Sequence, residues 1–215
     1  MTAAPISLQH RSGHDHRRLD PSTVIAPPPE HRATVRTTPL PTTGRFPPLF
    51  AVMGAHGGAG TSTLARWWAP AADIGTQWPG SDHTTQRVLL AARLCLPGLI
   101  AAADRLREWH AGLTPPEVTV IGLALTPVRT GRMPATVRRY RATVAALITP
   151  IYDIGWHDDL ACLELGELAQ TFPGDEEPTH RGRTALTRTV PHEVHRIAAD
   201  LLARLAAERT PDSQD

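Results

Sequence analysis

The residues that most clearly indicate a binding or catalytic site form a glycine-rich turn directly after the apolar run 49–53, namely Gly54-Ala55-His56-Gly57-Gly58-Ala59-Gly60-Thr61-Ser62. Such a turn between a strand and a helix can bind an anion, because glycine lets the backbone approach a phosphate and the helix start offers free N–H groups. The usual phosphate-loop pattern is G-x-x-x-x-G-K-[ST]. Here Ala55 stands where its first glycine belongs, and Thr61 stands where its lysine belongs. The turn therefore predicts an anion site without its usual cation.

Together with Thr63, the turn resembles the deviant phosphate loop of the ParA/MinD ATPases, G-x-K-G-G-x-G-K-[ST]-[ST]. The layout of residues 48–160 also resembles MinD-like proteins of actinobacteria that are often found on mobile elements. The resemblance implies an α/β fold of the P-loop NTPase type, with a reduced, doubly wound, mostly parallel sheet. It also implies a nucleotide site, with the Ser62 hydroxyl as the ligand of Mg²⁺. The candidate residues of that site are Gly57, Gly58, Ala59, Gly60, Thr61, Ser62 and Thr63.

The turn lacks both lysines of the family. His56 stands in place of the lysine that reaches the partner's nucleotide across a dimer, and Thr61 in place of the lysine that clamps the β and γ phosphates. All 22 basic residues of the chain are arginine, so no other lysine can substitute. Loss of such a charge typically costs several kcal/mol of transition-state stabilisation. Arg66 is the nearest cation along the chain, and we expect it to point to solvent.

A second departure concerns acidic residues. The family places aspartates at strand ends to position water and magnesium, but the segment between the turn and residue 87 offers only Asp73 and Asp82, and neither follows an apolar run. We therefore expect this strand and its aspartate to be missing. The departures predict weak binding of ATP and Mg²⁺, or none, and no catalytic residues. Three interpretations stay open: a turn that only packs, a weak nucleotide or anion site, and an ATPase whose lysines are replaced by arginine or in trans.

The pattern of apolar runs predicts an alternation of strands and helices, which is typical of a parallel sheet covered on both faces. Strands are expected at 49–53, 87–92, 118–125 and 151–156, and helices at 63–68, 99–109, 136–148 and 194–207. Residues 1–47 are rich in proline and arginine and predict a disordered tail. The α/β domain then spans 48–209, with a mobile loop at 174–186 and a disordered C-terminus at 210–215. Buried packing at the sheet edge is expected for Trp67, Trp68 and Trp78.

The remaining polar groups have competing interpretations. Asp158 and Asp159 follow a strand and either face the same crevice as the turn or form an acidic helix start. His192 and His195 are expected at the surface of a helix start, since their spacing does not match a metalloprotease helix. A basic cluster is able to contact nucleic acid, but the net charge of +1 favours a solvated helix face; its members are Arg129, Arg132, Arg138, Arg139 and Arg141.

The composition of the chain indicates its cellular location. No apolar run approaches the ~20 residues of a membrane span, and the N-terminus carries no signal-peptide pattern, so a cytoplasmic location is expected. Cys95 and Cys162 lie among apolar residues and are expected to be reduced and buried. The favoured interpretation is a degenerate MinD/ParA-like protein that acts through contacts with an unidentified protein partner; a nucleic-acid-binding accessory protein is the alternative.

Overall fold

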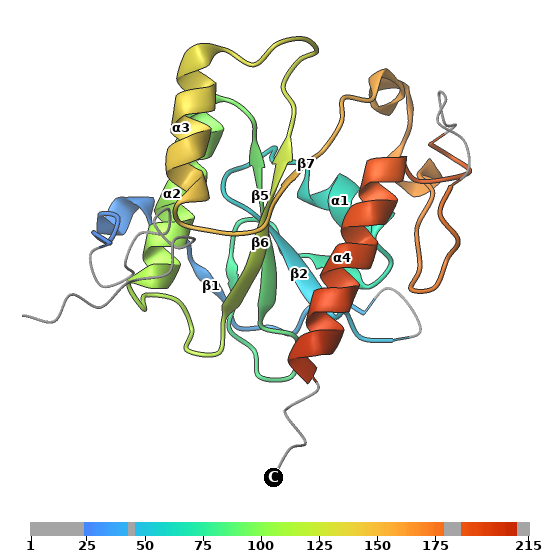
Figure 1. Ribbon diagram of the computed structural model, residues 1–215. Helices are drawn as coiled ribbons and strands as arrows, with labels where there is room; N and C mark the ends of the chain where they lie inside the picture. Colours follow the sequence, from blue (N-terminus) through green and yellow to red (C-terminus); the bar gives the residue numbers. More distant parts are fainter. Residues whose placement is uncertain (1–23, 43–45, 179–185, 210–215) are drawn as a thin grey trace, which may run out of the picture.

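The structure is a computed structural model that describes residues 24–42, 46–178 and 186–209. Its centre is a sheet of five parallel strands in the order β3-β2-β5-β6-β7 (Figure 1). The strands are β2 (Phe50–Gly54), β3 (Ala71–Asp73), β5 (Arg87–Arg93), β6 (Thr119–Thr126) and β7 (Ile151–Asp153). Numbered along the chain this is the order 2-1-3-4-5, which is one of the two common doubly wound arrangements. The prediction of a doubly wound parallel sheet is confirmed.

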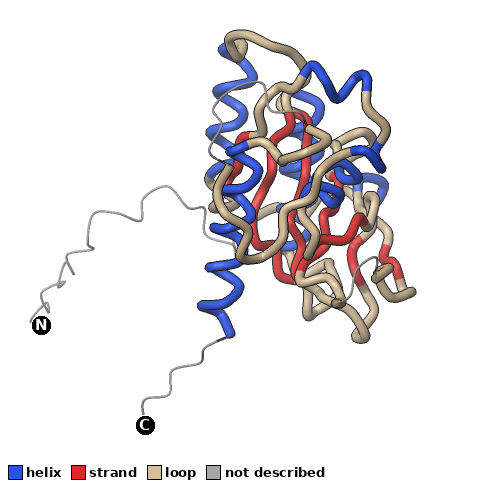
Figure 2. Tube along the Cα trace, turned by 90° about the vertical axis from the view of Figure 1, so that its right-hand side faces the viewer, coloured by secondary structure: helices blue, strands red, loops and turns tan. Residues whose placement is uncertain are grey.

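Helices cover both faces of the sheet (Figures 1 and 2). On one face lie α2 (Leu96–His110) and α3 (Ala135–Ala145), and on the other lie α1 (Thr61–Trp67) and α4 (His192–Arg209). The predicted helices and the four predicted strands are all present, with ends that differ by a few residues. α1 ends at Trp67, before Pro70, as expected for a residue that cannot continue a helix.

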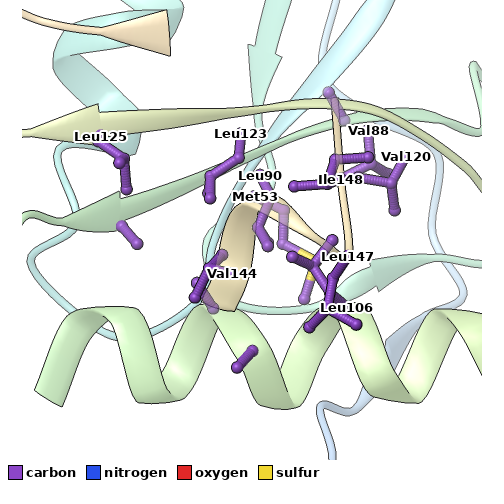
Figure 3. Packing of buried hydrophobic residues seen from close by; sticks show 14 of the residues in the cluster. Met53, Val88, Leu90, Leu106, Val120, Leu123, Leu125, Val144, Leu147 and Ile148 are labelled. Carbon is purple, nitrogen blue, oxygen red and sulfur yellow. The ribbon is translucent and has the colours of Figure 1, made fainter. Parts of the chain in front are cut away.

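Side chains that alternate along each strand divide the core into two clusters. Val88, Leu90 and Ala92 of β5 face α2 and α3, whereas Leu89 and Ala91 face α1 and α4. Figure 3 shows the first cluster, in which side chains from the strands meet those of the covering helices. Because both faces of β5 are covered, its five inner residues are all buried.

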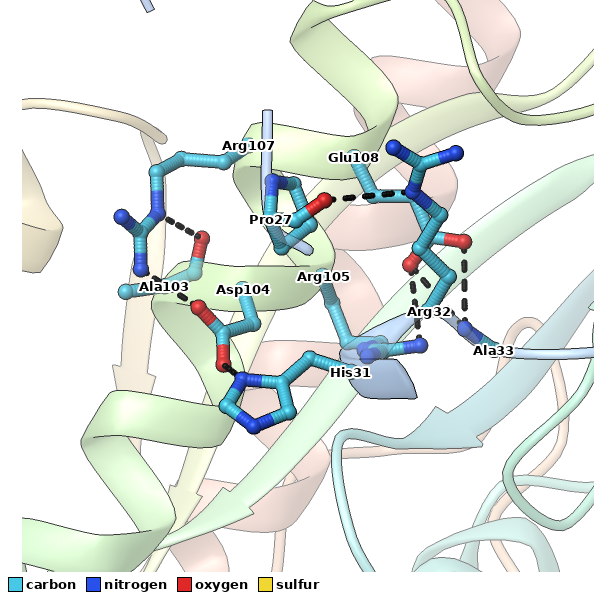
Figure 4. Close-up of polar contacts among 9 residues, drawn as sticks. All are labelled: Pro27, His31, Arg32, Ala33, Ala103, Asp104, Arg105, Arg107 and Glu108. Carbon is cyan, nitrogen blue, oxygen red and sulfur yellow. Dashed lines mark hydrogen bonds and ion pairs between the residues drawn. The ribbon is translucent and has the colours of Figure 1, made fainter. Parts of the chain in front are cut away.

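The N-terminal segment 24–42 is ordered, so the predicted tail is wrong for these residues. It contains a short 3-10 helix η2 (Pro29–His31) and a strand β1 (Val35–Arg36) that pairs in parallel with β4 (Trp78–Pro79). Leu40 is buried against the core of α2 and α3. The backbone N–H of Ala33 donates to both carboxylate oxygens of Glu108 on α2, at 3.1 and 3.2 Å (Figure 4). The segment is therefore ordered by contacts with residues distant in the sequence, which its own composition does not indicate.

Of the remaining expectations, some are confirmed and one is wrong. Trp67, Trp68 and Trp78 are each at most 1 % exposed, which confirms their predicted burial. Cys95 is half-buried and Cys162 is exposed, so the expectation of a buried cysteine is wrong for Cys162. Parts of the tail, loop and C-terminus predictions lie outside the described residues, namely 1–23, 43–45, 179–185 and 210–215.

Candidate functional site

The glycine turn lies at the carboxyl end of β2, between its two neighbouring strands. The Gly54 N–H donates at 2.7 Å to the carbonyl oxygen of Gly75, which lies just beyond the end of β3. The Ala55 N–H donates at 2.8 Å to the carbonyl oxygen of Ala91, which lies within β5. At this point the chain leaves β2 toward one face of the sheet, whereas β5 leads to α2 on the other face. Open α/β sheets bind ligands at such a switch point. The turn therefore occupies the position where this fold type places its sites.

Two glycines give the turn its shape. Gly58 and Gly60 have φ of 75° and 91°, in the left-handed region that strains other residues. A Cβ at Gly60 would also approach the Thr126 methyl group to 3.3 Å. The Thr126 hydroxyl donates to Ala59 O at 3.0 Å, so the end of β6 supports the turn from beneath. Substitution at Gly60 is disfavoured both by backbone conformation and by space.

His56 is bonded to the protein's own backbone through both ring nitrogens. The Arg93 N–H donates to His56 Nε2 at 3.1 Å, and His56 Nδ1 lies 2.8 Å from Gly57 O. An imidazole that accepts on Nε2 and donates from Nδ1 is the neutral tautomer. His56 thus connects the turn to β5, and in this arrangement it supplies no positive charge in place of the lysine of the resembling family.

The structure contains the strand and aspartate that the sequence analysis expected to be missing. β3 is a short edge strand beside β2, and Asp73 is its last residue. The Ser62 hydroxyl donates to Asp73 Oδ2 at 2.5 Å, and the Gly75 N–H donates to Asp73 Oδ1 at 2.8 Å. β3 was missed because only two alanines precede the aspartate, which is too short a run for a pattern of apolar residues. The site therefore has a hydroxyl and a carboxylate side by side.

Arg66 does not point to solvent as expected. Its Nε donates to Leu168 O at 2.9 Å and its Nη2 donates to Gly166 O at 3.0 Å, at the short helix η4 (Leu165–Glu167). This arginine therefore holds the 165–168 segment against α1 and is engaged away from the glycine turn.

A cavity of about 280 Å³ opens beside the turn. Gly60, Thr63 and Trp67 line one side, and the segment after β7 lines the other. Arg93, the last residue of β5, belongs to the lining because the alternation along β5 directs residues 89, 91 and 93 toward the face of α1 and α4. The sequence analysis did not select Arg93, although an arginine that ends a buried strand at the carboxyl edge of the sheet was a usable signal.

The segment after β7 closes the far side of the cavity. Asp158 lines it, whereas Asp159 is absent from the lining. Both aspartates also lie in the first turn of the short 3-10 helix η3 (Asp158–Cys162), as the interpretation of an acidic helix start predicts. The Trp156 indole N–H donates to Asp158 Oδ1 at 2.7 Å. The indole ring of Trp67 meets the ring of His157 edge to face, with centroids 5.8 Å apart.

Glu193 fixes this segment onto α4. Its Oε1 lies 2.9 Å from His157 Nε2 and accepts the Gly155 N–H at 3.2 Å. The hydrogen bond from His157 lowers the pKa of Glu193, although partial burial opposes the shift. Glu193 lies in the first turn of α4, whose start was expected only to carry surface histidines. It is therefore a positioning group for the cavity wall that the sequence analysis missed.

The predicted basic cluster lies on α3 and on the loop before it. Arg141 pairs with Asp153 at 2.7 Å, and Arg129 donates to Arg132 O at 3.0 Å. No acidic residue occurs between positions 127 and 152. Four members of the cluster are exposed, namely Arg129, Arg132, Arg138 and Arg139. These side chains form a positively charged surface that is separate from the residues lining the cavity.

Within the described residues, no group of three or more His, Cys, Asp or Glu side chains is arranged to hold a metal ion, and no helix is long and apolar enough to cross a membrane. Comparison with protein-family models found no match to this chain. Neither the curated proteins nor the solved structures gave a match. The resemblance to the ParA/MinD ATPases rests on the residues of the glycine turn and the layout that follows it.

Proposed function

We propose that the chain is a degenerate MinD/ParA-like P-loop protein that does not hydrolyse nucleotide and acts through contacts with another protein. The observation that carries this proposal is the engagement of His56. In this site the histidine that replaces one lysine is bonded to Gly57 O and to the Arg93 N–H, and the residue that replaces the other is an uncharged threonine. Without either cation, the turn has no group that neutralises the charge of a transferring phosphoryl group.

The same turn retains groups that suit a weak magnesium–nucleotide site. Ser62 and Asp73 supply a hydroxyl and a carboxylate 2.5 Å apart, and Mg²⁺ in nucleotide sites is usually held by one or two protein oxygens together with phosphate and water. These two residues would hold the ion, which would supply positive charge beside the phosphates. We therefore propose weak binding of ATP and Mg²⁺ without turnover.

The proposed protein contact is supported by exposed apolar side chains in the segment between β7 and α4. Trp156, Leu165 and Phe172 of this segment are 43 %, 46 % and 55 % exposed. Large apolar and aromatic side chains are enriched at protein-binding surfaces.

Calorimetric titration tests the nucleotide part of the proposal. Wild-type protein is titrated with ATP and with a non-hydrolysable analogue, each with and without Mg²⁺, and phosphate release is followed in parallel. We expect at most weak binding, which Ser62→Ala and Gly60→Asp reduce, and no phosphate release. Thr61→Lys restores the cation of the family and should strengthen ATP binding. Phosphate release by the wild type that Ser62→Ala abolishes would instead favour the alternative of an active ATPase, for which Arg93 is the nearest substitute cation.

The basic surface of α3 favours a second candidate function, nucleic-acid binding. Fluorescence anisotropy with a DNA duplex at increasing salt tests it, because binding through arginine–phosphate contacts weakens steeply as salt rises. Arg138→Gln with Arg139→Gln should weaken such binding, whereas Arg66→Gln, which alters an arginine engaged with backbone carbonyls, should not. A lack of binding at low salt would exclude this function for the chain.

A further inference from the structure

The cavity beside the glycine turn presents hydrogen-bond donors without partners. Trp67 is 1 % exposed, and its indole N–H is buried with no hydrogen-bond partner among the described residues. No described residue forms an ion pair or hydrogen bond with the Arg93 guanidinium, and none bonds the Thr63 hydroxyl. The Trp67 N–H has almost no accessible surface, so a molecule in the cavity does not reach it, and the groups that a ligand can contact are the Arg93 guanidinium and the Thr63 hydroxyl.

The other polar groups of the lining are already engaged. Thr126 donates to Ala59 O, and the Asp158 carboxylate accepts the Trp156 indole N–H. His157 is held by Glu193 at 2.9 Å. The groups that remain available are therefore a guanidinium and a hydroxyl. Since the guanidinium can only donate, a fitting ligand must bring acceptor oxygens, and the charge of Arg93 favours an anion.

The rest of the wall is apolar. Leu64 and Ile154 are 1 % and 7 % exposed, and Pro127, Leu160 and Ala161 complete this part of the lining. The cavity volume of about 280 Å³ lies just below the range of about 300–1,000 Å³ that is usual for drug-sized ligands. The space therefore suits a small molecule with one apolar group.

We propose that this cavity binds a small organic anion, a carboxylate or a phosphate monoester, whose charged oxygens contact Arg93 and the Thr63 hydroxyl and whose apolar body lies against Leu64 and Ile154. This site is adjacent to the turn and shares Gly60 and Thr63 with it. It does not require the turn to bind nucleotide, because Arg93 and Trp67 lie in the cavity itself. Nucleotide binding and anion binding can therefore fail or succeed separately.

Asp158 sets a further condition on the ligand. It is the one acidic residue among the described residues of the lining, and its negative charge lies on the wall opposite the turn. A like charge disfavours a bound anion, so Asp158→Asn should strengthen binding while Arg93→Gln weakens it. Opposite effects of two substitutions in one cavity are not expected from general damage to the fold.

The experiment uses the full chain and four probes: phenyl phosphate, phenylacetate, the neutral analogue benzyl alcohol and inorganic phosphate. Binding is followed by calorimetry and by ligand-observed NMR at millimolar probe. We expect binding of at least one of the two aryl anions and much weaker binding of both other probes, since each lacks either the charge or the apolar body. Which aryl anion binds more tightly distinguishes a phosphate monoester from a carboxylate ligand.

Variants of the lining residues test whether the anion binds in this cavity. Arg93→Gln should weaken binding about tenfold or more, as is usual for loss of a charge-assisted contact. Arg87→Gln, at the opposite end of the same strand, should leave binding unchanged. Failure of both aryl anions to bind, equal binding of benzyl alcohol, or unchanged affinity in folded Arg93→Gln would each overturn the proposal.

Discussion

Glu108 anchors the N-terminal segment to the domain, and its replacement by glutamine gives a prediction that can be worked from the structure (Figure 4). Its side chain is 1 % exposed and accepts the Ala33 N–H with both oxygens. Arg105 Nη1 lies 2.9 Å from Glu108 Oε2, and the Arg105 side chain is 8 % exposed. The pair is therefore a buried ion pair that also holds segment 24–42.

The energetic effect follows from the burial of both charges. Burial raises the pKa of Glu108 and lowers that of Arg105, and the charge of each partner opposes the shift in the other. Glu108→Gln keeps an acceptor for Ala33 but leaves the guanidinium with only Asp104 as a nearby carboxylate. Breaking a buried ion pair from one side typically costs about 3–5 kcal/mol. Because Asp104 compensates in part, we expect the free energy of unfolding to fall by about 3 kcal/mol.

Urea unfolding and hydrogen exchange measure this effect. Exchange of the amides in segment 24–42 should rise in Glu108→Gln, because the segment loses its anchor. Glu117→Gln alters an exposed glutamate and should change the free energy of unfolding by less than about 0.5 kcal/mol. The double variant Arg105→Met with Glu108→Leu removes both charges and should recover much of the loss. A loss below about 1 kcal/mol for Glu108→Gln, with unchanged exchange in the segment, would refute the reasoning.

Three further predictions concern other parts of the structure. Trp68→Phe removes an N–H that donates to Val194 O at 3.0 Å in the core, so chemical denaturation should show a loss of about 1 kcal/mol. The folded state lowers the pKa of Glu193, so its contribution to stability is present above about pH 4.3 and declines as the pH falls further; unfolding curves of Glu193→Gln should show a weaker loss of stability in acid than those of the wild type. Asp73→Asn should remove any magnesium dependence of ATP binding in calorimetry, while nucleotide binding that does not depend on Mg²⁺ should persist.

The main strands could be predicted because each is a contiguous apolar run, and the main helices because their apolar residues recur at helical spacing. β5 and β6 are buried on both faces, and strands of this kind have unbroken apolar runs in the sequence. The short edge strand β3 could not be predicted in this way, because an edge strand of three residues needs little apolar sequence. The N-terminal segment was missed for another reason: the contact between Ala33 and Glu108 joins residues 75 positions apart, and composition carries no trace of it.

The candidate site shows the same division. The glycine turn follows a motif, so its residues were identified from the sequence. The cavity depends on the approach of Gly60 to residues 154–161, which belong to a segment almost a hundred positions later. The sequence raised Asp158 as a possible neighbour, and the position of Arg93 at the end of a buried strand was a usable signal. The absence of a described partner for the Arg93 guanidinium could not be predicted, because it depends on neighbours in space.

Single-turnover hydrolysis tests the central claim most directly. Labelled ATP is mixed with excess protein and Mg²⁺, and phosphate release is compared among the wild type, Ser62→Ala, Arg93→Gln and a buffer control. The absence of both lysines and the engagement of His56 with the backbone predict release at the buffer rate in all cases. Release by the wild type above the buffer rate, reduced in Ser62→Ala and Arg93→Gln, would contradict the account and show that the turn is a working ATPase.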